Sequence, residues 1–183
     1  MKKILAIAAP LLALVSVAYA QTPESIAKSY FEMLRNKQWT QIAQLYDPGA
    51  LRDFREMMSF LLEVPDESAS QVLGALFGPG ATKQGVKAMS EAEFFAAFLG
   101  GVMARSAQLG QLNFETIEVL GSVGEGDSLR HVVTRTHISL ADMSMESMEV
   151  VSLKKVENEW KLLLQGKIKG MAQQIKKALE RAQ

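Results

Sequence analysis

Hydrophobic and polar residues alternate along the second half of the chain. Four segments show this period of two and are rich in Val, Ile, Thr, Leu and Phe: residues 112–123, 128–140, 144–156 and 160–169. The breaks between them, at 124–127, 141–143 and 157–159, are short and polar or turn-forming. Short breaks of this kind join antiparallel neighbours, so the pattern predicts four consecutive antiparallel strands.

Upstream of these strands, apolar residues recur every three or four positions, which is typical of amphipathic helices. Helix starts are indicated at 22–24 (Thr-Pro-Glu) and 47–48 (Asp-Pro), where a capping side chain precedes proline. A further start lies at Ser90, because Glu93 completes a capping box with it. The helices predicted in this half could cover one face of the sheet.

Glycine interrupts the helical pattern before Ser90. Four glycines and Pro79 lie between residues 74 and 85, and we expect 78–85 to form a mobile loop. After the strands, the apolar residues at 171, 175, 178 and 179 share one side of a helix, which predicts a C-terminal amphipathic helix.

This layout resembles the NTF2-like superfamily, whose fold is a cystatin-like α+β cone. The resemblance rests on the N-terminal helix followed by Gln-Trp-Thr at 38–40 and Asp-Pro at 47–48, and on hairpin strands that end in Glu-Trp-Lys-Leu at 159–162. It covers residues 24–62 and 112–169. It implies an α+β fold: a curved four-stranded antiparallel sheet with N-terminal helices on its concave face.

Two features depart from the superfamily pattern. Residues 64–105 are predicted to be helical where the superfamily often has a short early hairpin, and the C-terminal helix is an addition. Both differences could reshape or fill the pocket that the resemblance implies.

Residues 1–20 have the parts of a secretory signal peptide. Two lysines precede an apolar run at 4–15, and Ala18-Tyr19-Ala20 provides a small-x-small cleavage site. The apolar run is shorter than the ~20 residues of a membrane span. We therefore expect cleavage before Gln21, a single domain over 21–183, and a periplasmic or secreted protein.

Composition narrows the possible chemistry. The chain has no cysteine, which excludes thiol catalysis, disulfides and thiolate metal sites. Its 20 basic residues balance its 20 acidic residues, so there is no general attraction for nucleic acid or anionic membranes. No metal or cofactor is expected.

Strand pairing allows one face of the predicted sheet to be followed from strand to strand. A hairpin loop of two or four residues pairs positions whose numbers sum to an odd value. We start from the apolar alternating residues of the last predicted strand, Trp160, Leu162, Leu164 and Ile168. On the three preceding strands, the residues predicted to share their face are Met145, Ser147, Glu149, Val151 and Leu153; Arg130, Val132, Thr134, Thr136, Ile138 and Leu140; and Asn113, Glu115, Ile117, Val119 and Val123. Because most of these residues are apolar, we expect this face to pack against the helices.

The polar exceptions on this face are Glu115, Thr136 and Glu149, which are predicted to lie side by side on three strands. At ~4.8 Å per strand, the two carboxylates would be about 10 Å apart. A buried carboxylate has a raised pKa and can act as a general acid or base, so Glu115 and Glu149 are candidate catalytic residues. The alternative is that these groups lie at a solvated end of the sheet.

An apolar pocket between the helices and the sheet, closed by residues 78–85, is a second possibility. Its candidate ligand-binding residues are Phe94, Phe98, Thr136, Glu149 and Trp160. The alternative is that the phenylalanines and methionines only fill the core.

The opposite face mixes apolar side chains with His131, Arg135 and His137. Such a mixed face suggests a homodimer through the sheet, as is common among similar superfamily members. The alternative is that the C-terminal helix folds over this face. The two histidines would be about 20 Å apart at ~3.3 Å per residue, too far to share a metal ion. A Ser-His-Asp arrangement stays open, although no GxSxG motif is present.

Three hypotheses about function follow. The first is an exported, non-enzymatic binding protein that holds an apolar ligand or a protein segment in the cone. The second is a small enzyme of the ketosteroid-isomerase-like or hydrolase-like kind, with Glu149 or Glu115 as base. The third is a structural envelope protein with a filled core.

Overall fold

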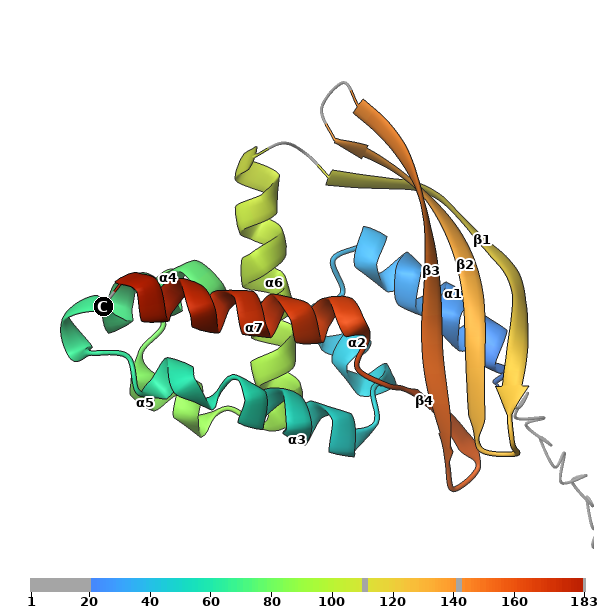
Figure 1. The fold of residues 1–183 in the computed structure, drawn as a ribbon, viewed down its shortest axis with the longest axis horizontal. Helices are drawn as coiled ribbons and strands as arrows, with labels where there is room; N and C mark the ends of the chain where they lie inside the picture. Colours follow the sequence, from blue (N-terminus) through green and yellow to red (C-terminus); the bar gives the residue numbers. More distant parts are fainter. Residues whose placement is uncertain (1–20, 110–111, 141–142, 183) are drawn as a thin grey trace, which may run out of the picture.

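The chain forms a curved sheet with its helices against the concave face (Figure 1). This computed structural model describes residues 21–109, 112–140 and 143–182, so the predicted signal peptide lies outside the described residues. The strands are antiparallel and lie in the order β1-β2-β3-β4. The α+β class expected from the sequence is confirmed, and so is the curved four-stranded antiparallel sheet with helices on its concave face (Figure 1).

The elements follow one another along the chain as helices, then strands, then a last helix. They are α1 (Pro23–Arg35), α2 (Trp39–Leu45), α3 (Pro48–Met57), the 3₁₀ helix η1 (Ser59–Leu62), α4 (Asp66–Phe77), α5 (Lys83–Ala88), α6 (Glu91–Leu109), β1 (Leu112–Glu125), β2 (Leu129–Leu140), β3 (Met143–Val156), β4 (Glu159–Leu162) and α7 (Gly166–Ala182). Across the described ranges, no helix has the length and apolar character needed to cross a bilayer.

The predicted helix starts are confirmed by side-chain caps. Thr22 Oγ1 accepts a hydrogen bond from the amide three residues on at 3.2 Å, and Asp47 Oδ2 does the same at 3.1 Å. At the start of α6, the amide and hydroxyl of Ser90 both donate to Glu93 Oε2 at 2.8 Å. Each cap satisfies a polar group that the helix itself leaves without a partner.

The glycine-rich segment is only partly a loop. Thr82 Oγ1 accepts from the Gly85 amide at 3.1 Å and begins α5, so the loop predicted over 78–85 is wrong from residue 83 onward. Gly78 and Gly80 have φ values of 100° and 82°, which residues with a side chain rarely adopt. The turn between α4 and α5 depends on these two glycines.

The pairing of β2 with β3 has the predicted parity, which means that the numbers of paired residues sum to an odd value. Val132 lies opposite Val151 and Thr134 lies opposite Glu149, so these residues share one face. Val132, Val151 and Leu153 are fully buried, which identifies this as the face covered by helices. The concave face predicted for these two strands is therefore confirmed.

Near the β1–β2 turn, the prediction for β1 is wrong. The turn has three residues, 126–128, where four were predicted, and this reverses the parity. Val123 consequently pairs with His131 on the convex face and is 64% exposed. A bulge just after Val119 restores the parity, so Val119 and Ile117 pack against the core as predicted.

A second bulge reverses the parity again at the far end of β1. Here Glu115 is the extra residue and is exposed, while Phe114 pairs with Ile138. Glu115 therefore does not join the concave face beside Thr136, and the predicted row of Glu115, Thr136 and Glu149 is wrong.

The last strand is shorter than predicted. β4 ends at Leu162, and α7 begins at Gly166 and runs back over the helices (Figure 1). Ile168 is buried, but it belongs to a helix and not to a strand. The prediction was wrong because the apolar residues in this segment have a spacing that fits both periods. The Asp47 amide donates to the Leu162 carbonyl at 2.9 Å, so the start of α3 borders this edge of the sheet.

An aromatic cluster fills the helical part of the core. The Phe54 ring lies 5.1 Å from those of Phe95 and Phe98 and 6.0 Å from that of Phe94, all edge to face. Phe94 and Phe98 are almost completely buried in it. Such contacts add to the stability gained from burial alone.

Candidate functional site

Polar side chains gather on the concave face of the sheet beneath α1 and the start of α7. Glu149 on β3 has a side chain that is only 17% exposed, and its Oε1 lies 2.5 Å from Lys167 Nζ on α7. Thr134 Oγ1 donates to the Glu149 carbonyl at 3.4 Å. The concave polar cluster is Tyr30, Tyr46, Thr134, Thr136, Glu149 and Lys167.

The two tyrosines of the cluster are held neutral. Burial raises the pKa of Tyr30 to about 12, and the negative charge of Glu149 adds to this shift. Burial also raises the pKa of Tyr46 well above its usual range. The rings meet edge to face with centroids 6.2 Å apart. Neutral phenols can donate as well as accept hydrogen bonds, so this end of the cluster can recognise a polar group.

Thr136 is a buried polar member of the cluster. Its side chain is 1% exposed, and its hydroxyl has no hydrogen-bond partner among the described residues. An unpaired buried hydroxyl costs about 1–3 kcal/mol. Because valine would fill the same space without this cost, the hydroxyl marks a position with a polar role.

Beyond the cluster, the concave face becomes apolar and open. The distal concave surface consists of Phe114, Ile138, Met143 and Met145, which share the face of Thr136 by register. Met143 and Met145 are 60% and 45% exposed. This end of β2 and β3 extends beyond α1 (Figure 1). An exposed apolar surface therefore adjoins the buried polar cluster.

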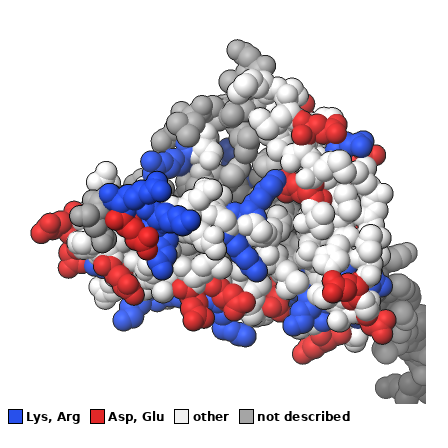
Figure 2. All heavy atoms as spheres, viewed as in Figure 1, with Lys and Arg blue, Asp and Glu red and all other residues white. Residues whose placement is uncertain are grey.

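Basic residues lie along α7, the helix whose first turn reaches Glu149. α7 carries five basic residues and one acidic residue, and Figure 2 shows lysine and arginine side chains over this helix. The exposed basic side chains are Lys167, Lys169, Lys176, Lys177 and Arg181. The carboxylate of Glu149 is thus the acidic partner of a basic helix.

The remaining predicted site residues lie elsewhere. Phe94 and Phe98 belong to the aromatic cluster among the helices. Trp160 pairs with Lys155, six residues along β3 from Glu149, and the Arg130 guanidinium lies 5.6 Å from its ring centroid. Of the five predicted ligand-binding residues, the structure brings together Thr136 and Glu149.

Three members of the cluster were not predicted from the sequence. Tyr30 carries a hydroxyl group on the otherwise apolar face of α1, and Tyr46 carries one directly after the apolar residues of α2; this was the available signal. Lys167 gave no signal, because the segment around it was assigned to a strand. Its position follows from the start of α7 at Gly166.

Two hollows lie among the helices, away from the sheet. One of about 560 Å³ is bordered by residues of α2, α5 and α6, including Trp39, Met89 and Ala96. Another of about 350 Å³ lies beside α3 and η1 and is bordered by Arg55, Met58 and Phe94. Neither is bordered by a strand residue, so both are separate from the concave polar cluster.

Within the described residues, no group of three or more His, Asp or Glu side chains is arranged to hold a metal ion. The chemistry of the cluster is that of hydroxyl groups, one carboxylate and one ammonium group.

No protein-family model matches the chain, and no curated protein matches its sequence. The chain is similar to the crystal structure of a Campylobacter jejuni protein that has the provisional name NTF2-like transpeptidase, with 12% sequence identity, a TM-score of 0.40, and 79% of this chain and 99% of that chain covered.

Proposed function

We propose that the chain is an exported binding protein that holds a small apolar ligand against the concave face of its sheet, and that this concave site is non-enzymatic. The apolar part of the ligand lies on the distal concave surface. A polar group of the ligand meets the concave polar cluster, where Thr136 and the neutral tyrosines offer hydrogen bonds.

One observation carries this proposal. The buried, unpaired hydroxyl of Thr136 shares its face with the exposed Met143 and Met145. Binding sites for small molecules combine an apolar lining with a few placed polar groups. Methionine also suits such a surface, because its flexible side chain adapts to ligands of different shape.

The test pairs two methionines on opposite faces of β3. Met145 lies on the concave face and Met148 on the convex face, and both are exposed. With N-phenyl-1-naphthylamine as the apolar probe, we expect Met145→Glu to weaken binding at least tenfold and Met148→Glu to leave it unchanged. Equal effects of the two substitutions would contradict a concave site.

Export and a natural ligand can be tested together by native mass spectrometry of protein purified from a bacterial periplasm. The proposal expects a mass that begins at Gln21. It also expects an added mass that disappears on denaturation. A chain that retains residues 1–20 would contradict cleavage, and a chain without added mass would leave only the probe experiment in support.

A second candidate function is proton transfer or hydrolysis with Glu149 as the acid or base. It is favoured by the shielding of this carboxylate and by its nearness to Tyr30, whose pKa it raises. Glu149→Gln distinguishes the two functions. An enzyme that uses Glu149 would lose about 100-fold in turnover of its substrate, whereas a non-enzymatic concave site would have no turnover that depends on Glu149.

The convex face offers a place for a second copy of the chain. Met148 lies opposite Arg135 and is 60% exposed there, among the ion pairs that Arg135 makes with Glu118 and Glu146 at 3.3 Å. Alternating charges can pair across a two-fold axis, so we include a homodimer through this face in the proposal. We expect Met148→Glu to convert the dimer to a monomer in the same mass spectra.

A further inference from the structure

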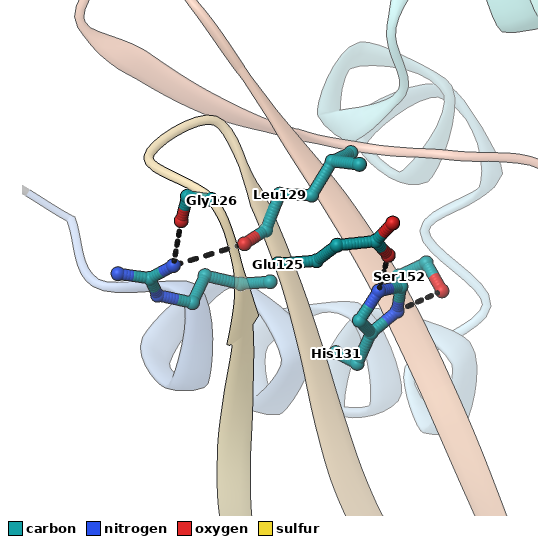
Figure 3. Close-up of polar contacts among 6 residues, drawn as sticks. Glu125, Gly126, Leu129, His131 and Ser152 are labelled. Carbon is teal, nitrogen blue, oxygen red and sulfur yellow. Dashed lines mark hydrogen bonds and ion pairs between the residues drawn. The ribbon is translucent and has the colours of Figure 1, made fainter.

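Three residues on the convex face of the sheet form a hydrogen-bonded chain (Figure 3). Ser152 Oγ on β3 lies 2.9 Å from Nδ1 of His131 on β2. The other ring nitrogen of His131, Nε2, lies 3.0 Å from Oε2 of Glu125 at the end of β1. A hydroxyl, an imidazole and a carboxylate in this order are the groups of a serine nucleophile, its base and an orienting acid.

The strands fix this geometry. His131 pairs directly with Ser152 across β2 and β3, and with Val123 across β1 and β2. The three-residue turn that follows Glu125 is held by Arg130, whose Nη1 donates to the carbonyls of Gly126 and Leu129 at 3.0 Å. The three functional groups therefore rest on paired backbone rather than on a loop.

The carboxylate determines which nitrogen of His131 carries the proton. An ionised carboxylate only accepts hydrogen bonds, so Nε2 of the neutral ring must be the donor to Glu125. Nδ1 is then unprotonated and accepts the hydrogen bond from the Ser152 hydroxyl. This is the tautomer that a general base requires, with the two ring nitrogens exchanged relative to a serine protease.

We propose that Ser152 is a nucleophile for acyl transfer and that its substrates are esters with a small apolar acyl group. Val123 lies opposite His131 on β1, and Val150 lies two residues from Ser152 on β3. They are 64% and 55% exposed and provide apolar contact for the acyl group. Lys154 lies two residues from Ser152 on the same face of β3, so that their Cα atoms are about 7 Å apart. We assign its exposed side chain the role of stabilising the oxyanion.

The reaction has two steps. Ser152 Oγ bonds to the acyl carbon, and its proton passes to Nδ1 of His131. The bond from that carbon to the alcohol oxygen breaks, and the leaving oxygen takes the proton from His131. Water then attacks the acyl-serine by the same route, which releases the carboxylic acid and restores the hydroxyl.

The test uses a fluorophosphonate, which loses fluoride when serine attacks phosphorus, together with p-nitrophenyl acetate. We expect one adduct on Ser152, no adduct in Ser152→Ala, and labelling of His131→Gln slower by about 100-fold. Ser144 is an exposed serine on the same face of β3, so Ser144→Ala is the matched control and is expected to label normally. An adduct elsewhere, or ester hydrolysis unchanged in Ser152→Ala, overturns the proposal.

A second measurement uses the absence of cysteine from the chain. Ser152→Cys introduces a single thiol, whose alkylation by iodoacetamide we expect to slow at least tenfold when His131→Gln is added. An unchanged rate would show that His131 does not activate this position. For Glu125, a positioning residue, we expect Glu125→Ala to shift the His131 tautomer seen in ¹⁵N chemical shifts; an unchanged tautomer contradicts its assigned role.

Discussion

The ammonium group of Lys167 lies 2.5 Å from a carboxylate oxygen of Glu149, and this contact ties the first turn of α7 to the concave face of β3. The two side chains differ in environment, since that of Lys167 is 67% exposed and that of Glu149 is 17% exposed. The contact therefore serves mainly to neutralise a shielded carboxylate at the edge of the concave polar cluster.

Removing this ammonium group should have a small effect on stability. We expect Lys167→Met to lower the free energy of unfolding by about 0.5–1 kcal/mol, because solvent screens an ion pair with one exposed partner. Urea denaturation measures this change. Lys169→Met, on the same exposed turn, is the control and is expected to cost less. A loss well above about 2 kcal/mol would mean that Glu149 is far less solvated than its exposure indicates.

Removal of the buried hydroxyl of Thr136 should weaken ligand binding without lowering the stability of the free protein. We expect Thr136→Val to leave the free protein equally stable or more stable by up to about 1 kcal/mol, since it removes an unpaired polar group without a change of shape. Binding of a ligand through its polar group should become weaker. Thermal unfolding and titration with a ligand recovered from the periplasm measure the two effects.

Thr134→Val is the matched control for this prediction. Thr134 is as deeply buried as Thr136, but its hydroxyl donates to the Glu149 carbonyl at 3.4 Å. We therefore expect Thr134→Val to be destabilising by about 1 kcal/mol. If both substitutions lower stability by the same amount, the hydroxyl of Thr136 is satisfied in solution.

Buried tyrosine makes stability sensitive to alkaline pH. The folded state keeps the pKa of Tyr30 at about 12, whereas in the unfolded chain it is near 10. The unfolded chain loses its proton first, so the free energy of unfolding falls as the pH rises from about 10 to about 12. We expect this fall to be smaller in Tyr30→Phe by about 2–3 kcal/mol.

Urea denaturation at a series of alkaline pH values provides the measurement. Tyr19 lies outside the described residues, and burial also raises the pKa of Tyr46, so Tyr46→Phe should reduce the fall as well. An identical pH dependence in the unaltered chain and in Tyr30→Phe would contradict the burial of this phenol.

The sequence was sufficient for the fold class because turns, caps and periodicity are local signals. It was not sufficient for the register of β1. There a three-residue turn and two bulges each exchanged the residues that face the helices for those that face outward. The bulge just after Val119 compensated for the turn, whereas the bulge at Glu115 was not compensated. Ile117 and Val119 were therefore placed correctly, while Val123 and Glu115 were not. No residue type marks a bulge strongly enough to predict it.

The candidate site was harder to predict because it depends on elements distant in sequence. Thr136 and Glu149 were found because strand alternation placed them on an apolar face. Lys167 could not be found in this way, since its segment has apolar spacing compatible with either a strand or a helix. The hydrogen-bonded chain of Glu125, His131 and Ser152 required the exact turn length that the sequence left open.

Arg55 should be essential for holding α5 in place. Its guanidinium donates to the carbonyls of Met89, Val86 at 3.4 Å and Lys87 at 2.8 Å, and it lies 5.3 Å from the centroid of the Phe94 ring. The Val86 and Lys87 carbonyls belong to the last turn of α5, where the regular hydrogen bonds of the helix end, and Met89 directly follows the helix. We expect Arg55→Met to lower the free energy of unfolding by about 2 kcal/mol, because a charged donor to several acceptors is lost.

Hydrogen exchange should locate this effect. Amides of α5 and of residue 89 are expected to exchange faster in Arg55→Met, whereas those of the sheet should keep their relative protection. Arg55→Lys should rescue only part of the loss, since an ammonium group cannot reproduce the planar fork that spans three carbonyls. Arg52→Met changes an exposed arginine three residues earlier on α3 and serves as the control. If Arg55→Lys restores full stability, charge rather than the geometry of the guanidinium holds α5 against α3.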